Sequence, residues 1–378
     1  MIRRFYEPLG GYLEPNKVLV IYGPRRVGKT TLLDNYLSTT KMRYRHAIGD
    51  NVPMQQLLSS LDITIIKEYL EGYELFAIDE AQFVPNIGRA LKIIVDQIPA
   101  IYVIATGSSS FELAGQIGEP LTGRKRTLTL FPIAHAELLS LYNRFDLRQG
   151  LREHLIFGTY PDIITAETRT QKIERAHEIA GSYLLKDILA FERVKGSKKL
   201  WGLLRLLAFQ IGSEVSYNEL ATNLGVNVRT VQHYLDLLEK SFVIYRLGGF
   251  SRNLRKEVTQ KSKYYFFDNG IRNAVIAQFN RLELRDDVGA LWENFIVMER
   301  VKYLTYSANV ANLYFWRTYS QQEIDFVEER GKKLDGYEFK WSPKKYAKAP
   351  SEWVNAYSEA SYTVITADNY QEFVLPQT

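Results

Sequence analysis

The stretch that most constrains the fold is "KVLVIYGPRRVGKTTLLDNYL", near the start of the sequence. The β-branched and apolar run 18–22 predicts a buried strand, and "TTLLDNYL" predicts an amphipathic helix. Between them, Gly23, Gly28, Lys29 and Thr30 have the spacing of a loop whose backbone N–H groups bind phosphate at the N-terminus of the following helix. The stretch therefore predicts an α/β fold built around a phosphate-binding loop.

The loop and the start of the helix supply the predicted nucleotide contacts. Lys29 is expected to reach the β and γ phosphates of ATP, and the Thr30 hydroxyl is expected to bind Mg²⁺. The alternative, a glycine-rich turn that happens to contain a lysine, is disfavoured by the strand–loop–helix setting. The predicted nucleotide-binding residues are Gly23, Pro24, Arg25, Arg26, Val27, Gly28, Lys29, Thr30, Thr31 and Ser108.

Two further apolar runs end in polar residues that suit the same site. "LFAIDE" ends in Asp79 and Glu80, and "AIYVIATGSSS" contains Thr106 and Ser108. Ligands of α/β proteins bind at the carboxyl ends of the strands. Asp79 is therefore expected to hold Mg²⁺ through water, and Glu80 to orient and activate the attacking water. Thr106 or Ser108 could sense the γ-phosphate, and the sequence does not choose between them or exclude ordinary turn chemistry.

A basic segment, "EPLTGRKRTLTL", follows these runs. Arg124 and Arg126 are expected on a short loop before a strand. An arginine there could stabilise transition-state charge in its own subunit or in a neighbour's site. The alternative is a basic loop in solvent.

The middle of the chain reads as helices followed by a winged helix. Residues 145–195 have helical spacing. "VSYNELATNLGVNVRTVQHYLDLLEK" then has helix–turn–helix spacing with a glycine in the turn, and "VIYRLGGF" and "KYYFFD" supply two wing strands. Arg229, Gln232 and His233 are expected on the exposed face of the second helix of this motif, where such residues contact DNA.

Charge favours DNA as the partner of this region. Residues 195–272 contain 13 Lys and Arg against 6 Asp and Glu, a balance of +7 in a chain whose net charge is +5. A basic patch on a winged helix is typical of nucleic-acid binding, although winged helices also bind proteins. The wing segment contributes Arg252, Arg255, Lys256, Lys261 and Lys263.

The C-terminal part predicts a helix, three consecutive strands, a further helix and a last strand. Glu293 lies on the first helix, Asp325 in "EIDFVEER", and Glu338 and Lys340 in "DGYEFKW". Glu293, Asp325 and Glu338 could hold Mg²⁺ through oxygen ligands. Lys340 shares a strand face with Glu338 and could stabilise developing charge. On its own this pattern is also typical of a solvated strand face.

Several of these motifs together resemble a known family. "GPRRVGKTTLL", "LFAIDEAQ", "ATGSSSFEL", "LTGRKRTLTLFPIAHAEL" and "FGTYPDII" look like AAA-type ATPases paired with a C-terminal domain of the DUF4143 type, and the resemblance covers almost the whole chain. DUF4143-type domains resemble PD-(D/E)xK nucleases with a restriction-endonuclease-like core. Asp325, Glu338 and Lys340 match that motif, and Ile324 replaces its proline. The resemblance implies a nuclease-like fold without deciding activity.

Length and composition limit the number of domains, the kinds of site and the location that we expect. A chain of 378 residues is too long for one ordinary core. We expect an ATPase core, a helical lid, a winged helix and a nuclease-like domain over residues 1–145, 146–195, 196–275 and 276–378. The absence of cysteine excludes disulfides and cysteine-ligated metals. No apolar run is long enough to span a bilayer and no signal peptide is evident, so a cytoplasmic protein without a membrane partner is expected.

The combined hypothesis is an ATP-hydrolysing, DNA-binding protein that could cleave or remodel DNA, using ATP and Mg²⁺. Two alternatives remain at this point. One is an ATP-controlled binding switch whose nuclease-like domain is inactive. The other is a DNA translocase that assembles as a homo-oligomeric ring and uses Arg124 or Arg126 in trans.

Overall fold

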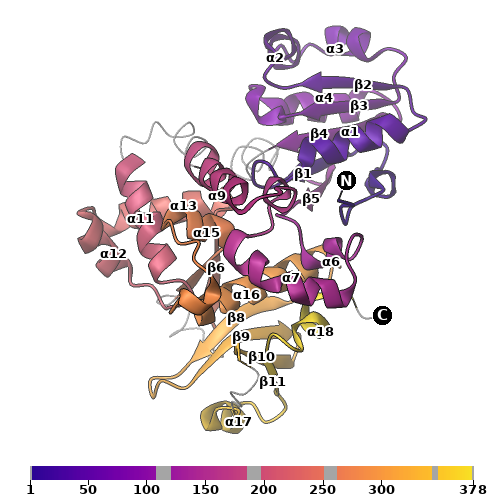
Figure 1. The fold of residues 1–378 in the computed structure, drawn as a ribbon. Helices are drawn as coiled ribbons and strands as arrows, with labels where there is room; N and C mark the ends of the chain where they lie inside the picture. The colour runs from indigo at the N-terminus through magenta and orange to yellow at the C-terminus, as the bar shows by residue number, and fades with distance from the viewer. Residues whose placement is uncertain (1, 108–120, 185–196, 251–261, 343–347, 377–378) are drawn as a thin grey trace. The chain divides into compact units, whose positions relative to one another are not determined.

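The computed structural model describes residues 2–107, 121–184, 197–250, 262–342 and 348–376. They form two compact units, which are described separately (Figure 1). The N-terminal unit holds residues 4–131 with 240–242, and the C-terminal unit holds 132–239 and 243–378 with the first three residues. Five residues of the predicted sites lie outside the described residues: Ser108, Arg252, Arg255, Lys256 and Lys261.

The N-terminal unit is built on a parallel five-stranded sheet of order β2-β3-β4-β1-β5, which confirms the predicted α/β class. Its strands are β1 Val18–Tyr22, β2 Tyr44–Ile48, β3 Leu75–Asp79, β4 Tyr102–Gly107 and β5 Lys125–Thr129. Its helices are η1 Leu9–Tyr12, α1 Lys29–Thr39, α2 Val52–Ser59, α3 Ile63–Leu70, η2 Ala81–Phe83 and α4 Ile87–Gln97.

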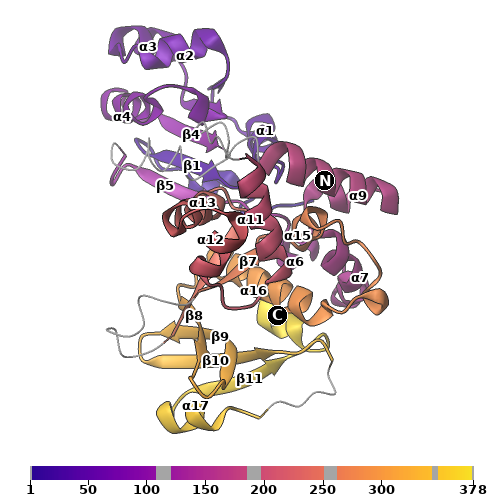
Figure 2. The same ribbon diagram turned by 90° about the vertical axis from the view of Figure 1, so that its left-hand side faces the viewer.

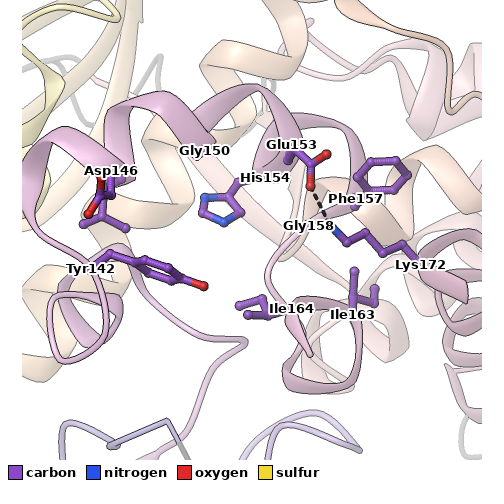
Figure 3. Close-up of a pocket in the computed structure, with 11 residues that line it drawn as sticks. Tyr142, Asp146, Gly150, Glu153, His154, Phe157, Gly158, Ile163, Ile164 and Lys172 are labelled. Carbon is purple, nitrogen blue, oxygen red and sulfur yellow. Dashed lines mark hydrogen bonds and ion pairs between the residues drawn. The ribbon is translucent and has the colours of Figure 1, made fainter. Parts of the chain in front are cut away.

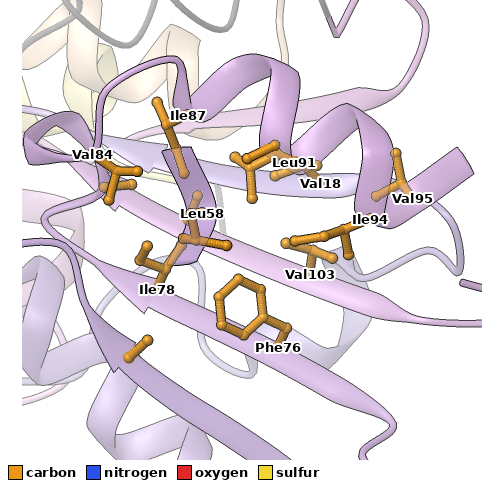
Figure 4. Close-up of a cluster of buried hydrophobic side chains, with 14 of the residues drawn as sticks. Val18, Leu58, Phe76, Ile78, Val84, Ile87, Leu91, Ile94, Val95 and Val103 are labelled. Atoms are coloured by element: carbon orange, nitrogen blue, oxygen red, sulfur yellow. The ribbon is translucent and has the colours of Figure 1, made fainter. Parts of the chain in front are cut away.

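The core of this unit lies between the sheet and helices α2, α3 and α4. Alternate residues of the strands face these helices, as the pleat requires. Phe76 and Ile78 of β3 are fully buried and belong to one apolar cluster with Leu58 of α2 and Leu91 of α4 (Figure 4). Helix α1 lies on the other face of the sheet (Figure 2). Because the strands are parallel, the carboxyl ends of β1, β3 and β4 meet at one edge of the sheet.

The C-terminal unit has a mixed six-stranded sheet of order β11-β10-β9-β8-β6-β7. Its strands are β6 Ile244–Gly249, β7 Ser262–Phe266, β8 Asn312–Arg317, β9 Glu323–Arg330, β10 Lys333–Phe339 and β11 Ser361–Ile365. Its helices are α6 His135–Leu138, α7 Arg144–Phe157, α8 Pro161–Ile164, α9 Arg169–Glu178, η3 Ile179–Leu184, α11 Ser197–Phe209, α12 Tyr217–Leu224, α13 Val228–Lys240, α15 Asn269–Val275, η4 Leu282–Leu284, α16 Val288–Tyr306, α17 Ser351–Ala356 and α18 Tyr370–Val374.

The predicted helix–turn–helix is present as α12 and α13. The Ser216 hydroxyl accepts from the Glu219 N–H at 3.3 Å and so caps α12. Gly225 ends α12 with a φ of 62°, a left-handed conformation that glycine adopts without strain. These local signals were sufficient to predict the helices from the sequence.

Strand pairing crosses the predicted boundary between residues 275 and 276. Strand β6 pairs with β7 in an antiparallel ladder, as expected of a wing, but its other edge pairs in parallel with β8, where Gly248 lies opposite Tyr314. The Phe250 N–H extends this pairing by donating to the Phe315 carbonyl at 2.6 Å. A strand edge has unpaired N–H and C=O groups that a neighbouring strand can satisfy. The wing hairpin is therefore part of the C-terminal sheet.

Asn294 of α16 closes the outer edge of this sheet. Its side chain is fully buried and accepts from the Phe266 N–H at 2.7 Å. Its amide donates to the Phe266 carbonyl at 2.9 Å and to the Asn269 Oδ1 at 2.6 Å. One side chain thus satisfies the backbone of edge strand β7 as a further strand would.

Replacing Asn294 with leucine should destabilise the C-terminal unit by about 2–4 kcal/mol, because the N–H and carbonyl of Phe266 would stay buried without partners. The five tryptophans of the chain all lie in this unit. Urea unfolding of the full chain followed by tryptophan fluorescence therefore measures the effect. Asn312→Leu, at an exposed asparagine of β8, is the control. Equal stabilities of the two variants would contradict this role of Asn294.

Candidate functional site

The phosphate-binding loop runs from the end of β1 to the start of α1. A Cβ atom on Gly23 would lie 1.9 Å from the Leu130 carbonyl oxygen, so a larger residue would displace the loop. Gly28 has a φ of 92° at the N-cap of α1. The backbone conformation therefore requires glycine at both positions, as the spacing predicted.

Arg4 supports this loop, a role that no sequence motif indicates. Its guanidinium is buried and donates to the carbonyl oxygens of Val27 and, at 2.8 Å, of Phe131. A buried guanidinium is stable only when its donors are satisfied. Arg4 thus ties the loop to the segment that follows β5. A single arginine near the N-terminus carries no local signal for this role.

The structure brings together Thr30, Asp79 and Thr106 below the loop. The Thr30 hydroxyl donates to Asp79 Oδ2 at 2.8 Å, and the Thr106 hydroxyl donates to Asp79 Oδ1. Lys29 donates to the carbonyls of Gly23 at 2.9 Å and Pro24 at 2.8 Å. A hydroxyl beside a carboxylate offers the oxygen ligands that Mg²⁺ prefers. Thr30 and Asp79 therefore fit the predicted metal position.

Glu80 follows Asp79 in a strained position. Its φ is 50°, in the left-handed region that non-glycine residues rarely adopt. Its N–H donates to the Thr106 hydroxyl at 3.1 Å, and the Gln82 amide donates to its carboxylate. Thr106 therefore connects Asp79 to Glu80. Strain of this kind is found at functional sites, where the surrounding contacts hold the side chain in one orientation.

Arg124 and Arg126 lie at the opposite edge of the sheet. Lys125 is in register with Val18 at the start of β1, whereas the phosphate loop follows the other end of that strand. Arg124 pairs with Asp96 at 2.6 Å, and Arg126 lies over the Tyr12 ring. Five residues of strand span about 15 Å. Neither arginine lies at the phosphate-loop end of its own sheet, and the two roles that the sequence left open, in its own subunit's site or in a neighbour's, stay predictions.

The acids of the C-terminal unit lie on the elements that the sequence predicted. Glu293 is on α16, Asp325 in β9, and Glu338 near the end of β10 with Lys340 just after it. The Phe339 N–H donates to Asp325 Oδ2 at 2.7 Å, and the Lys340 ammonium pairs with the Glu338 carboxylate. The acids thus approach each other, but each is already engaged by a donor of the protein.

Lys263 lies among these acids, contrary to its predicted place in a solvated basic wing. Its side chain is 2% exposed, and its ammonium pairs with Glu323 and, at 3.4 Å, with Glu293. The Tyr265 hydroxyl also donates to Glu293, at 2.8 Å. The physical reason is that β7, the edge strand of this sheet, lies beside α16, so that Lys263 pairs with Glu293 of α16 and Glu323 of β9 instead of facing solvent.

The electrostatics of this centre follow from burial and from the paired charges. Burial raises the pKa of Glu293 to about 7, although Lys263 opposes the shift. Burial also raises the pKa of Asp325, against Lys263, and that of Glu338, with a further contribution from Asp325. Burial alone would lower the pKa of Lys263, but Glu293, Asp325 and Glu323 raise it. The ammonium is thus held in its charged form.

The predicted magnesium site of Glu293, Asp325 and Glu338 is not formed. Within the described ranges, no three aspartate, glutamate or histidine side chains are grouped so that they could hold a metal ion. One oxygen of each acid is engaged by a donor of the protein: Oε1 of Glu293, Oδ2 of Asp325 and Oε1 of Glu338. These residues therefore do not fit the metal that a nuclease-like centre implies.

On α13, the predicted DNA-facing residues lie mostly at the surface. Arg229 and Gln232 are exposed, and His233 is half-buried. Between them, Val231 is fully buried and holds the opposite face of the helix in the core. This pattern is that of an amphipathic helix with one face in the core and the opposite face at the surface.

A pocket of about 240 Å³ lies between α7, α8 and α9, and the sequence did not predict it (Figure 3). The His154 ring points into it, and a pair of Glu153 and Lys172 closes one side. Behind His154, its Nδ1 lies 2.9 Å from His135 Nε2. Burial lowers the pKa of both histidines to about 3, with Lys302 adding to the effect on His135, so both rings are neutral at pH 7.

Comparisons with known families divide the chain into three parts. Residues 15–139 match the AAA domain (AAA_14). Residues 148–282 and 288–376 match two domains of unknown function, DUF8612 and DUF4143. These matches support the AAA and DUF4143 parts of the expected resemblance, and thereby an ATPase in general. The nuclease-like character of the last domain stays a proposal.

The chain is also similar to several uncharacterized proteins. One from Mycobacterium tuberculosis is 28% identical over 337 residues, which cover 85% of this chain and 70% of the relative. One from Haemophilus influenzae is 24% identical over 361 residues, with 87% and 84% covered. Among solved structures, a RuvB variant of Thermotoga maritima matches with 17% identity, a TM-score of 0.27, and 61% and 82% covered. A similarity at that level carries no argument about this chain.

Across the described ranges, no helix has both the length and the apolar character that crossing a bilayer requires.

Acid should destabilise the C-terminal unit through His135. Its pKa is about 3 when folded and about 6.5 when unfolded, so below pH 6.5 protons bind mainly to the unfolded chain and stability falls as pH falls. Between pH 7 and pH 5 the loss is about 2 kcal/mol for this residue. Urea unfolding at both pH values, followed by tryptophan fluorescence, should show that His135→Gln removes about this much of the loss. His177→Gln, at an exposed histidine, should not. The same pH dependence in all three proteins would contradict the assignment.

Proposed function

We propose that the N-terminal unit binds and hydrolyses ATP with Mg²⁺. The observation that carries this proposal is the hydrogen-bonded set of Thr30, Asp79 and Thr106 directly below a loop whose glycines the backbone requires. The match of residues 15–139 to the AAA domain supports it independently. The nucleotide would bind along Gly23 to Thr31, with its phosphates at the N-terminus of α1.

Each polar residue of this set then has a role. Lys29, which contacts the loop carbonyls of Gly23 and Pro24, is already at the phosphate position and would exchange them for phosphate oxygens. Thr30 and Asp79 would hold Mg²⁺, which neutralises the charge developing on the phosphates. Glu80, held by its strained backbone and by Gln82, would orient the attacking water.

An arginine contribution to this reaction requires a second copy of the chain. Arg124 and Arg126 lie at the far edge of their own sheet, so they can meet a nucleotide only in a neighbouring subunit. This placement supports a homo-oligomer, a ring or a dimer, in which the basic edge of one subunit faces the phosphate loop of the next.

Lys29→Ala and Glu80→Gln should each lower the rate of ATP hydrolysis by roughly 10²–10³-fold, because each removes a group that acts on the transferred phosphoryl or on the water. Lys29→Ala should also weaken nucleotide binding, whereas Glu80→Gln should bind nucleotide nearly as the parent protein does. Phosphate release and binding of a fluorescent ATP analogue give the two readouts. Lys41→Ala, at an exposed lysine, is the control. Full activity in Lys29→Ala would exclude this site.

For the C-terminal unit we propose DNA contact through α13. Its exposed Arg229 and Gln232 and the basic balance of residues 195–272 support this. The alternative to DNA contact is that the same helix binds a partner protein. We place ATP-controlled binding above DNA cleavage, because the acids of this unit are engaged by Lys263, Lys340 and the Phe339 N–H.

Arg229→Ala should weaken duplex DNA binding by about 5–100-fold and lower the salt slope of the affinity by about one, because one phosphate contact would be lost. Gln232→Ala should weaken binding with little change in slope. Fluorescence anisotropy over a range of salt concentrations, with and without an ATP analogue, measures both. Arg281→Ala, at an exposed arginine outside residues 195–272, is the matched control. If the unaltered protein binds no duplex, single-stranded, forked or junction DNA, the protein-binding rival is favoured.

A further inference from the structure

The centre formed by Glu293, Glu323, Asp325 and Glu338 already contains a cation. Lys263 reaches it from β7 with a side chain that is 2% exposed, pairs with Glu323 and lies 3.4 Å from Glu293. Its ammonium also lies 5.4 Å from the centre of the Phe315 ring, a second favourable contact for a cation. A buried ammonium is tolerated only where such partners replace water. The position of Lys263 is therefore fixed by these contacts.

The remaining acids of the centre are also engaged. Asp325 accepts from the Phe339 N–H, Glu338 pairs with Lys340, and Arg317 lies 3.7 Å from Glu323. A divalent ion would need several of these oxygens at once and would be repelled by an ammonium in the same space. A divalent ion bound to both Glu293 and Glu323 would have to displace the Lys263 ammonium that pairs with them.

We propose that Lys263 takes the place of a divalent metal ion in this centre. Its ammonium is the tethered counter-cation for Glu293 and Glu323, so the charge of these acids is compensated in part without metal and the chain does not cleave DNA by metal-assisted hydrolysis. In this role the centre joins β7, α16 and β9, and so fixes the β6–β7 hairpin to the rest of the C-terminal unit. The proposal does not depend on whether the chain binds ATP or DNA.

Metal binding by the folded protein is the first test. Electron paramagnetic resonance of Mn²⁺ measures free ion without nucleotide, in an Asp79→Asn background that removes the metal ligand of the N-terminal unit. We expect that no equivalent of Mn²⁺ binds to this protein. We also expect that adding Glu338→Gln does not change the concentration of free Mn²⁺. One equivalent of bound Mn²⁺ that Glu338→Gln releases would overturn the proposal.

Removal of the tethered cation is the second test. Lys263→Met keeps the length of the side chain but leaves the acids uncompensated. Thermal unfolding followed by tryptophan fluorescence should show a lower transition for this variant in metal-free buffer, and Mn²⁺ should raise it by roughly 5 °C or more at saturation. All proteins of this test carry the Asp79→Asn background of the first test, and in it the parent chain and Lys333→Met, at an exposed lysine of β10, should not respond to Mn²⁺. A folded Lys263→Met protein that Mn²⁺ does not stabilise would contradict the proposal. If that variant does not fold, the Mn²⁺ measurement on the folded protein decides.

Discussion

The parallel pairing of β6 with β8 is the interaction on which the C-terminal unit depends. It joins a hairpin that follows a helix–turn–helix to the strands that carry Asp325 and Glu338, and so makes one sheet from two predicted domains. Once β7 lies in that sheet, Lys263 is turned into the interior, and its charge must be compensated there. Glu293 on α16 and Glu323 on β9 supply the compensation. The strand order thus places Lys263 in the interior, and its burial there requires the acids that pair with it.

The N-terminal unit could be predicted from the sequence in detail because its signals are local. Each buried parallel strand is a short apolar run, and the residues that follow each run meet at one edge by the geometry of a parallel sheet. The Thr30–Asp79 contact follows from two such runs. The support from Arg4 could not be predicted, since its partners are backbone carbonyls. Every residue has a backbone carbonyl, so the amino-acid sequence does not mark which ones Arg4 contacts. The same geometry applies to Arg124, which comes just before β5 and therefore lies at the opposite end of the sheet from the phosphate loop.

The C-terminal unit was predicted in its elements and not in their assembly. Caps, turns and alternation indicated α12, α13 and the strands correctly, because each depends on neighbours in sequence. The pairing of β6 with β8 joins segments far apart in the chain, and only two register pairs define it. The burial of Lys263 was missed for a related reason. A lysine in "QKSKYYFF" looks solvated until its counter-charges, which lie in other elements, are brought to it.

The two acidic centres of this chain differ in the donors that surround their carboxylates, and this difference is the basis for proposing a metal site in one and a structural role for the other. Asp79 and Asp325 are both buried aspartates on strands. Asp79 accepts from the neutral hydroxyls of Thr30 and Thr106, which orient the carboxylate but leave its charge to be balanced by a ligand. Asp325 lies beside Lys263, whose ammonium already balances the acids around it. Hydroxyl donors thus prepare a carboxylate for a cation from solution, and a buried ammonium removes the need for one. The same acids in sequence therefore suit opposite functions, and the charge of the nearest buried side chain distinguishes them.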